Sequence, residues 1–228
     1  RAFYEAVVRK RYGEDVDEYD KEDMEEKIEK GVRQEKYFFQ KVYEIVSSTR
    51  EENPEKEKLL LLDIDETIGR MRFDDQGDEI IGTTLRPSLI PLLSILKTEY
   101  PDLKVGILST RAKEYIKEQI KDQNHLGPIN EYVEGDEVYS ASETENKFEM
   151  LKSEEIQENL KQYPDIDPEL ISEDISWQFD PQDFKKLEVI KSIYEKKPET
   201  IIISVDDAQF PARLKHGICL HEEGGFWI

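Results

Sequence analysis

The chain has 228 residues and a formal net charge of -21 at pH 7, which excludes the lysine-rich and arginine-rich surfaces that nucleic acids and anionic membranes require. Its single cysteine excludes an intramolecular disulfide framework and is typical of a reducing, cytoplasmic compartment. No apolar run is long enough to span a bilayer, and the length suits one sizeable domain with an appended helical element.

The first 57 residues are predicted to form a helical extension to the domain over residues 58–228. The segment from Asp15 to Lys30 is almost entirely charged, and the segment from Lys36 to Ser48 carries aromatic and valine side chains at helical spacing. We expect helices that pack on the flank of the domain. No catalytic group is predicted in them.

A leucine run follows and ends in two acids. Residues Leu59 to Thr67 read LLLLDIDET and are bounded by polar sequence on both sides, which is typical of a buried strand of a parallel sheet. Asp63 and Asp65 would then lie at the carboxyl end of that strand, where open α/β sheets place their ligand sites. Because an isolated D-x-D pair more often stabilises a turn, a catalytic interpretation needs support from distant parts of the chain.

A small hairpin is expected after this segment. The ranges Arg70 to Phe73 and Glu79 to Thr84 flank the turn signal DDQGD. Such a flap beside the acids would be too short to act as a closing helical lid. Pro87 and Ser88 then begin a predicted helix with leucines on its inner side, and Arg86 before it is expected to support structure.

Two further apolar runs end in polar groups. Lys104 to Thr110, KVGILST, precedes a helical pattern, and Thr200 to Asp207, TIIISVDD, ends in adjacent acids. Apolar strands that alternate with amphipathic helices predict a doubly wound, Rossmann-like α/β fold with converging strand ends. Each polar residue also has a structural interpretation, since Ser109 could cap the next helix, and Lys185 and Lys186 lie in a helix whose lysines usually face solvent.

A polar, acidic insertion is predicted over residues 122–182. It contains an amphipathic segment around Phe148 and Leu160 and a loop punctuated by prolines. Trp177 and Phe179 are candidates for recognition or for anchoring that loop to the core. A helical cap at this place would cover the site and favour small substrates.

Taken together, these segments resemble the short motifs of the haloacid dehalogenase (HAD) superfamily of phosphatases, in the order and spacing of that superfamily. The residues DIDET match its motif D-x-D-x-T after a hydrophobic strand. The resemblance implies that Asp63 is the nucleophile, that Asp65 is the general acid and base, and that Thr67 orients the loop.

The second and third motifs imply groups that hold the phosphate. Ser109 matches the hydroxyl of the second motif, and the adjacent Thr110 is the alternative. Lys186 matches the basic third motif, and Lys185 is its alternative. A lysine at this place would add positive charge at the transferring oxygens.

The fourth motif implies a metal site. Asp206 and Asp207 match it, and Asp207 is favoured as the direct ligand. The implied cofactor is Mg²⁺, held by Asp63, Asp207 and the main-chain carbonyl of Asp65, because this ion prefers oxygen ligands.

The resemblance implies a Mg²⁺-dependent phosphatase that forms an aspartyl phosphate. The short flap, with Arg86 and Pro87 after it, looks like the branch of the superfamily that acts on phosphoproteins, and bacterial effector phosphatases of this type act on phosphotyrosine. A phosphorylated protein is therefore the expected partner. A small phosphorylated metabolite or nucleotide is the alternative substrate, and a HAD-fold binding module without turnover is the alternative function.

Other chemistries lack their residues. The chain has no G-x-x-x-x-G-K-[ST] loop, no arginine after Cys219, and no second histidine after His221 in HEEGG. Cys219 is expected to be a buried strand residue. Because the chain begins with Arg1 and ends in FWI, we expect a fragment of a longer protein, whose secretion into a host cell stays open.

Overall fold

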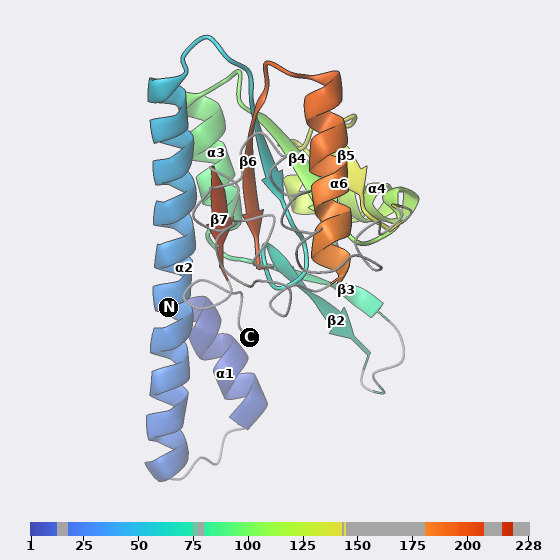
Figure 1. The fold of residues 1–228 in the computed structure, drawn as a ribbon. Helices are drawn as coiled ribbons and strands as arrows, with labels where there is room; N and C mark the ends of the chain where they lie inside the picture. The colour runs from blue at the N-terminus through green and yellow to red at the C-terminus, as the bar shows by residue number, and fades with distance from the viewer. Residues whose placement is uncertain are drawn as a thin grey trace.

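The computed structural model describes residues 1–12, 18–74, 76, 80–142, 144, 181–207 and 216–220. These residues form a five-stranded sheet, a two-stranded hairpin and flanking helices (Figure 1). The predicted α/β class is confirmed, and the sheet is compatible with a Rossmann-like arrangement. Across the described residues, no helix combines the length and the apolar character needed to cross a bilayer.

The strands of the main sheet are all parallel, in the order β5-β4-β1-β6-β7. The central strand β1 is buried at every residue, as a continuous leucine run requires when helices cover both faces of a sheet. β1, β4 and β6 are the strands expected from the apolar runs. The strand bounds are β1 Lys58–Leu62, β4 Lys104–Ser109, β5 Val138–Ser140, β6 Ile201–Asp206 and β7 Gly217–Cys219.

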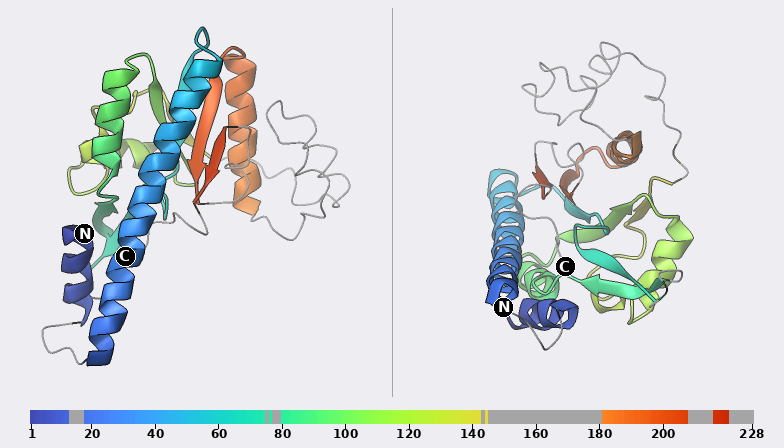
Figure 2. Two further views of the ribbon diagram at one scale, coloured as in Figure 1. Left: turned by 90° about the vertical axis from the view of Figure 1, so that its left-hand side faces the viewer. Right: turned by 90° about the horizontal axis from the view of Figure 1, so that it is seen from below.

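Helices cover the sheet on both sides. Helices α3 (Leu89–Glu99) and α4 (Lys113–Lys121) lie on one face, and α6 (Pro181–Lys196) lies on the other (Figure 2). The leucines that were expected on the inner side of α3, such as Leu93, are buried, and so is Ile190 in α6. A short 3₁₀ turn, η1, follows α4 and spans Gly127–Ile129.

The register of the strands brings remote polar residues to one edge of the sheet. Leu62 in β1 pairs with Ile107 in β4 on one side and with Val205 in β6 on the other. Asp63 and Asp206 each come one residue later, so they lie side by side at this edge. In a parallel sheet this edge, at the carboxyl ends of the strands, is the usual place for a ligand site.

The predicted hairpin is present at the same edge. Strands β2 (Gly69–Phe73) and β3 (Ile80–Leu85) pair in antiparallel fashion. The N–H of Thr83 donates a hydrogen bond of 2.9 Å to the carbonyl oxygen of Asn124, which fastens the hairpin to the segment after α4. The hairpin is therefore attached to the domain as a flap.

The N-terminal residues form two helices, α1 (Ala2–Tyr12) and α2 (Glu18–Glu52). One continuous helix, α2, contains the second predicted segment and the first from Glu18 onward, because no proline interrupts it. Phe38 and Val42 in α2 belong to the core that α3 and the sheet share. The N-terminal part of α2 extends past the sheet and carries α1 along its side (Figure 1).

Part of the stretch assigned to an insertion belongs to the sheet. Strand β5 lies within residues 122–182 and pairs with β4, so the core of the fold continues past residue 122. Cys219 lies in β7, as expected, and its side chain is outside the described set. Other residues that the sequence singled out also lie outside the described residues: Phe148, Leu160, Trp177, Phe179 and His221.

Candidate active site

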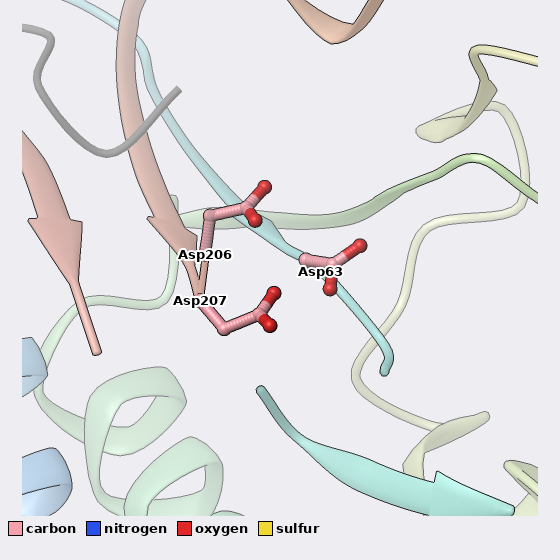
Figure 3. Close-up of side chains that lie close together, drawn as sticks. All are labelled: Asp63, Asp206 and Asp207. Carbon is pink, nitrogen blue, oxygen red and sulfur yellow. The ribbon is translucent and has the colours of Figure 1, made fainter. Parts of the chain in front are cut away.

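Three carboxylates meet at the carboxyl ends of β1 and β6. Oxygen atoms of Asp63, Asp206 and Asp207 all lie within 4.8 Å of one another. Figure 3 shows the side chains of Asp206 and Asp207 extending from the end of β6 toward the side on which Asp63 lies. Asp63 follows β1, whereas the other two acids come from the end of β6, so the parallel pairing of these strands joins acids that are remote in sequence. We call these three residues the acidic cluster.

Lys186 from α6 contacts two members of the acidic cluster. Its Nζ lies 2.9 Å from Oδ1 of Asp63 and 3.0 and 2.8 Å from the two carboxylate oxygens of Asp206. The lysine is buried, although lysines of an amphipathic helix usually face solvent. Lys185 is half-buried. Of the two lysines that the sequence left open, Lys186 is therefore the one that the structure places against the acids.

Burial and charge act in opposite senses on these groups. Burial raises the pKa of Asp63, and the ammonium group of Lys186 opposes that rise. For Lys186, burial works to lower the pKa, but the carboxylates of Asp63 and Asp206 outweigh it, so that its pKa lies above the ordinary value. Lys186 therefore favours the ionised form of Asp63, but burial outweighs it, and the pKa of Asp63 lies above its ordinary value.

The loop after β1 folds back in a tight turn. The carbonyl oxygen of Ile64 accepts a hydrogen bond of 3.1 Å from the N–H of Ile68, and Glu66 adopts the left-handed φ of 56°. The turn directs Thr67 into the interior, where its Oγ1 accepts a hydrogen bond of 2.9 Å from the backbone N–H of Asp207. Thr67 thus joins the first acidic segment to the last, which agrees with an orienting role.

Asp65 lies apart from the acidic cluster and pairs with Arg111. The Nε of Arg111 donates a hydrogen bond of 2.9 Å to Oδ2 of Asp65, and its Nη2 donates to Oδ1, which makes the pair bidentate. The side chain of Asp65 is 40% exposed, compared with 5% for Asp63. Within the first acidic pair, Asp65 is therefore the residue with the more exposed side chain.

Sequence reasoning did not assign a role to Arg111. Its Nη1 donates a hydrogen bond of 2.7 Å to Oε1 of Gln119, and its carbonyl oxygen accepts one of 2.7 Å from the hydroxyl of Ser140. The signal in the sequence was Gln119, a polar residue on the apolar face of α4 that is buried in the structure. A buried glutamine needs hydrogen-bond partners, and Arg111 is the nearest preceding arginine.

The two hydroxyls at the end of β4 have different surroundings. Ser109 is fully buried, and its Oγ accepts a hydrogen bond of 3.2 Å from the backbone N–H of Arg111. The N-cap residue of α4 is Ala112, so the interpretation of Ser109 as the cap of this helix is wrong. Thr110 is half-buried. Thr110 is therefore the more accessible residue, whereas the hydroxyl of Ser109 is bonded to the main chain of Arg111.

The acidic cluster has the composition of a site for a hard divalent cation. Its ligand atoms are carboxylate oxygens, which Mg²⁺ and similar ions prefer. Among the residues that the structure describes, three carboxylates lie close to the single positive charge of Lys186, which leaves an excess of negative charge when the cluster is ionised. Both properties fit the implied cofactor.

Comparisons of the chain with models of protein families, with curated proteins and with solved structures found no match. No relative therefore assigns an activity to this chain. A functional conclusion depends on the arrangement of the acidic cluster, Lys186, and the pair of Asp65 and Arg111.

Proposed function

We propose that the protein is a Mg²⁺-dependent phosphatase of the HAD type, which hydrolyses phosphomonoesters through a phosphorylated Asp63. The observation that carries the proposal is the meeting of three remote segments: Asp63 lies 2.9 Å from Lys186, and its carboxylate lies within 4.8 Å of those of Asp206 and Asp207. A D-x-D-x-T loop alone is a weak signal. Its contact with a buried lysine and a second acidic segment is what supports this chemistry.

Asp63, Asp207 and the main-chain carbonyl of Asp65 would hold Mg²⁺. When bound, the ion offsets the repulsion between the phosphate and the carboxylates. Asp206 directs both carboxylate oxygens to Lys186, which suits it to hold the lysine in place. Asp207 is therefore the direct ligand of the last acidic pair in this proposal.

In the first displacement, a carboxylate oxygen of Asp63 forms a bond to phosphorus as the bond from phosphorus to the substrate oxygen breaks. Asp65 gives its proton to that departing oxygen. Lys186, in contact with Asp63, stabilises the negative charge that gathers around the transferring group. The burial of Asp63 keeps competing water away from the nucleophile.

In the second displacement, Asp65 takes a proton from a water molecule. The oxygen of this water attacks phosphorus, the bond to Asp63 breaks, and inorganic phosphate leaves. The 40% exposure of Asp65 suits a group that exchanges protons with substrate and water in turn. Arg111 orients its carboxylate through two hydrogen bonds.

We propose phosphoproteins, phosphotyrosine included, as the substrate class. The flap of β2 and β3 is short, and its side chains Phe73, Ile80 and Ile81 are exposed. Exposed apolar side chains on a hairpin that follows the Asp63 loop suit contact with the residues around a phosphorylated side chain of a protein. A compact metabolite offers fewer such contacts.

Release of inorganic phosphate from an aryl phosphate tests the proposed activity. The activity should require Mg²⁺ and should fall below detection in Asp63→Asn, because an amide cannot replace the attacking carboxylate. Asp136→Asn is the matched control, since Asp136 is exposed, and it should retain full activity. Circular dichroism of both variants checks folding. Phosphate release that survives in folded Asp63→Asn would remove Asp63 as the nucleophile.

The substrate class needs a separate comparison on one preparation. Peptides with phosphotyrosine should give the highest kcat/KM, phosphoserine peptides a lower one, and nucleotides and sugar phosphates the lowest. A preference for a nucleotide or a sugar phosphate would contradict the assignment to phosphoproteins while leaving the phosphatase chemistry intact.

A further inference from the structure

Arg86 is a buried arginine that contacts the loop of residues 63–69, which we call the nucleophile loop. Its side chain has 0% exposure, and its Nε donates a hydrogen bond of 2.9 Å to the carbonyl oxygen of Thr67. Its backbone N–H donates another of 2.9 Å to the carbonyl oxygen of Ile68. Thr67 is the residue whose side chain joins the two acidic segments, so Arg86 holds the main chain at the point where the loop is fixed. The proposed catalytic steps make no use of Arg86.

The Arg86 side chain also contacts residues of α2. Oε1 of Glu35 lies 3.3 Å from Nη1 of Arg86, and the guanidinium carbon lies 4.4 Å from the centre of the Phe38 ring. Burial lowers the pKa of Arg86, and the negative charge of Glu35 opposes this change. A guanidinium removed from water is costly unless it is paired, so Glu35 and Phe38 determine where this group lies.

Glu35 connects three helices at one point. Its Oε1 also accepts a hydrogen bond of 3.0 Å from the hydroxyl of Tyr4 in α1. Its Oε2 accepts one of 3.0 Å from the backbone N–H of Ser88, just before α3, and another from the hydroxyl of Ser88. With its side chain only 12% exposed, Glu35 uses both oxygens inside the protein.

α1 reaches Glu35 because α2 has a glycine where the two helices meet. A Cβ atom at Gly31 would lie 2.3 Å from two carbon atoms of the Tyr4 ring, so a larger residue would displace Tyr4. Tyr4 is buried together with Val8 and Ile28. Figure 2 shows α1 lying beside α2 at the end away from the sheet.

We propose that α1 and α2 hold the nucleophile loop in its catalytic conformation. The contacts run from Tyr4 to Glu35, from Glu35 to Arg86, and from Arg86 to the carbonyl oxygen of Thr67. The N-terminal helices are then part of the active-site scaffold. Glu35 and Arg86 are positioning residues, because they act through the loop and touch no reacting atom. The kinetic consequence rests on the proposed phosphatase function, and the structural consequence does not.

Glu35→Gln tests this inference, because it keeps the shape of the side chain and removes the charge opposite Arg86. For an aryl phosphate, kcat should fall roughly tenfold to a hundredfold, with little change in KM, since the nucleophile is misplaced while the substrate still binds. Thr49→Val is the matched control. Thr49 in α2 is also buried, and its hydroxyl lies 3.2 Å from Nδ1 of His216, so it bonds α2 to the core at another place. This control should lose stability and keep kcat.

Amide hydrogen exchange of residues 63–69 provides a readout that needs no activity. Exchange in this loop should be faster in Glu35→Gln than in Thr49→Val when the two variants are compared at equal distance below their Tm. Tyr4→Phe, which removes one hydroxyl and retains the ring, should change kcat and exchange in the same direction by less. It carries the test if Glu35→Gln does not fold.

The outcomes separate the two proposals. Unchanged kcat in folded Glu35→Gln, or equal loop exchange in Glu35→Gln and Thr49→Val, would overturn the positioning role. The unmodified protein could release no phosphate while amide exchange in the nucleophile loop is still faster in Glu35→Gln than in Thr49→Val. That result would overturn the phosphatase function and keep the positioning role.

Discussion

The two acidic pairs of the site look alike in sequence and differ in space. Each pair contributes one buried acid that contacts Lys186, namely Asp63 in the first pair and Asp206 in the second. We call these the inner acids. The other members, Asp65 and Asp207, are the outer acids. The ion pairs of Lys186 that the structure describes are with Asp63 and Asp206. A short acidic motif therefore supplies one group for a buried charge network and one for a different task.

The outer acids differ from each other as well. Asp65 pairs with Arg111 and is 40% exposed, which suits proton transfer. Asp207 is half-buried, shares a close group of oxygens with the inner acids, and hydrogen-bonds with Thr67, which suits a metal ligand. The elements around each aspartate, and not the residue type, therefore give the two outer acids different surroundings.

Loss of Lys186 removes its ion pairs with Asp63 and Asp206 at the same time and has the largest expected effect. Lys186→Met leaves both inner acids buried without the ammonium group, and breaking a buried ion pair in this way costs about 3–5 kcal/mol. Phosphate release should be abolished as well. Urea unfolding in the presence and absence of Mg²⁺, together with the phosphate assay, measures the two effects.

Lys185→Met is the matched control for that variant. Lys185 is the neighbouring lysine and is half-buried, so its loss should change the free energy of unfolding by at most about 0.5 kcal/mol and leave activity intact. Equal losses in the two variants would show that the contact with the inner acids is not what makes Lys186 important.

The outer acids are expected to give distinct kinetic changes. Asp207→Asn removes charge from the acidic cluster, so the Mg²⁺ concentration for half-maximal activity should rise roughly tenfold to a hundredfold. Asp65→Asn keeps its main-chain carbonyl, so the Mg²⁺ requirement should stay the same. Its kcat should fall roughly 10²-fold to 10⁴-fold, because general acid and base catalysis is lost.

Assays with two aryl phosphates that differ in the acidity of the leaving phenol distinguish the kinetic changes of Asp65→Asn from those of Asp207→Asn. A more acidic phenol departs without a proton, so the loss of kcat in Asp65→Asn should shrink for that substrate, whereas Asp207→Asn should show no such dependence. Mg²⁺ titrations on both substrates complete the measurement. The same shift in Mg²⁺ requirement for both variants would remove the distinction between the outer acids.

The sheet and the meeting of the acids followed from simple patterns. Buried parallel strands are continuous apolar runs, so Leu59 to Leu62 and Ile201 to Val205 are visible without a structure. Because parallel strands end at one edge, the acids after them were expected to converge, and they do. The helical periodicity of α3 and α6 likewise identified the side chains that face the core.

What the patterns missed depends on contacts between remote elements. The helical pattern around Lys186 favoured a solvated lysine, yet Lys186 is buried and its Nζ contacts the acids. The pairing of Asp65 with Arg111 needs the turn after β1 to place one side chain outward, and no local pattern encodes that turn. The role of Arg86 was seen as structural, but its partner Glu35 lies in a helix that appeared to be a separate extension.

An ion pair on the surface is expected to contribute least to the free energy of unfolding among the pairs considered. Nη1 of Arg50 donates a hydrogen bond of 2.6 Å to Oδ2 of Asp102 and joins the end of α2 to the turn after α3. This bond lowers the pKa of Asp102 below its ordinary value, although the side chain is 58% exposed. A lowered pKa in the folded state means that the stabilisation is complete above roughly pH 5 and is lost as the pH falls through the lowered value.

Asp102→Asn should therefore cost less than about 1 kcal/mol at pH 7, because water and salt screen the pair. Urea unfolding should show that the difference from the unmodified protein shrinks both in high salt and as the pH falls below the lowered pKa of Asp102, while phosphate release at neutral pH is unchanged. A cost at pH 7 as large as that of Lys186→Met would mean that burial adds nothing to the energy of the inner acids, and the contrast between the buried and the exposed members of the two acidic pairs would lose its physical basis.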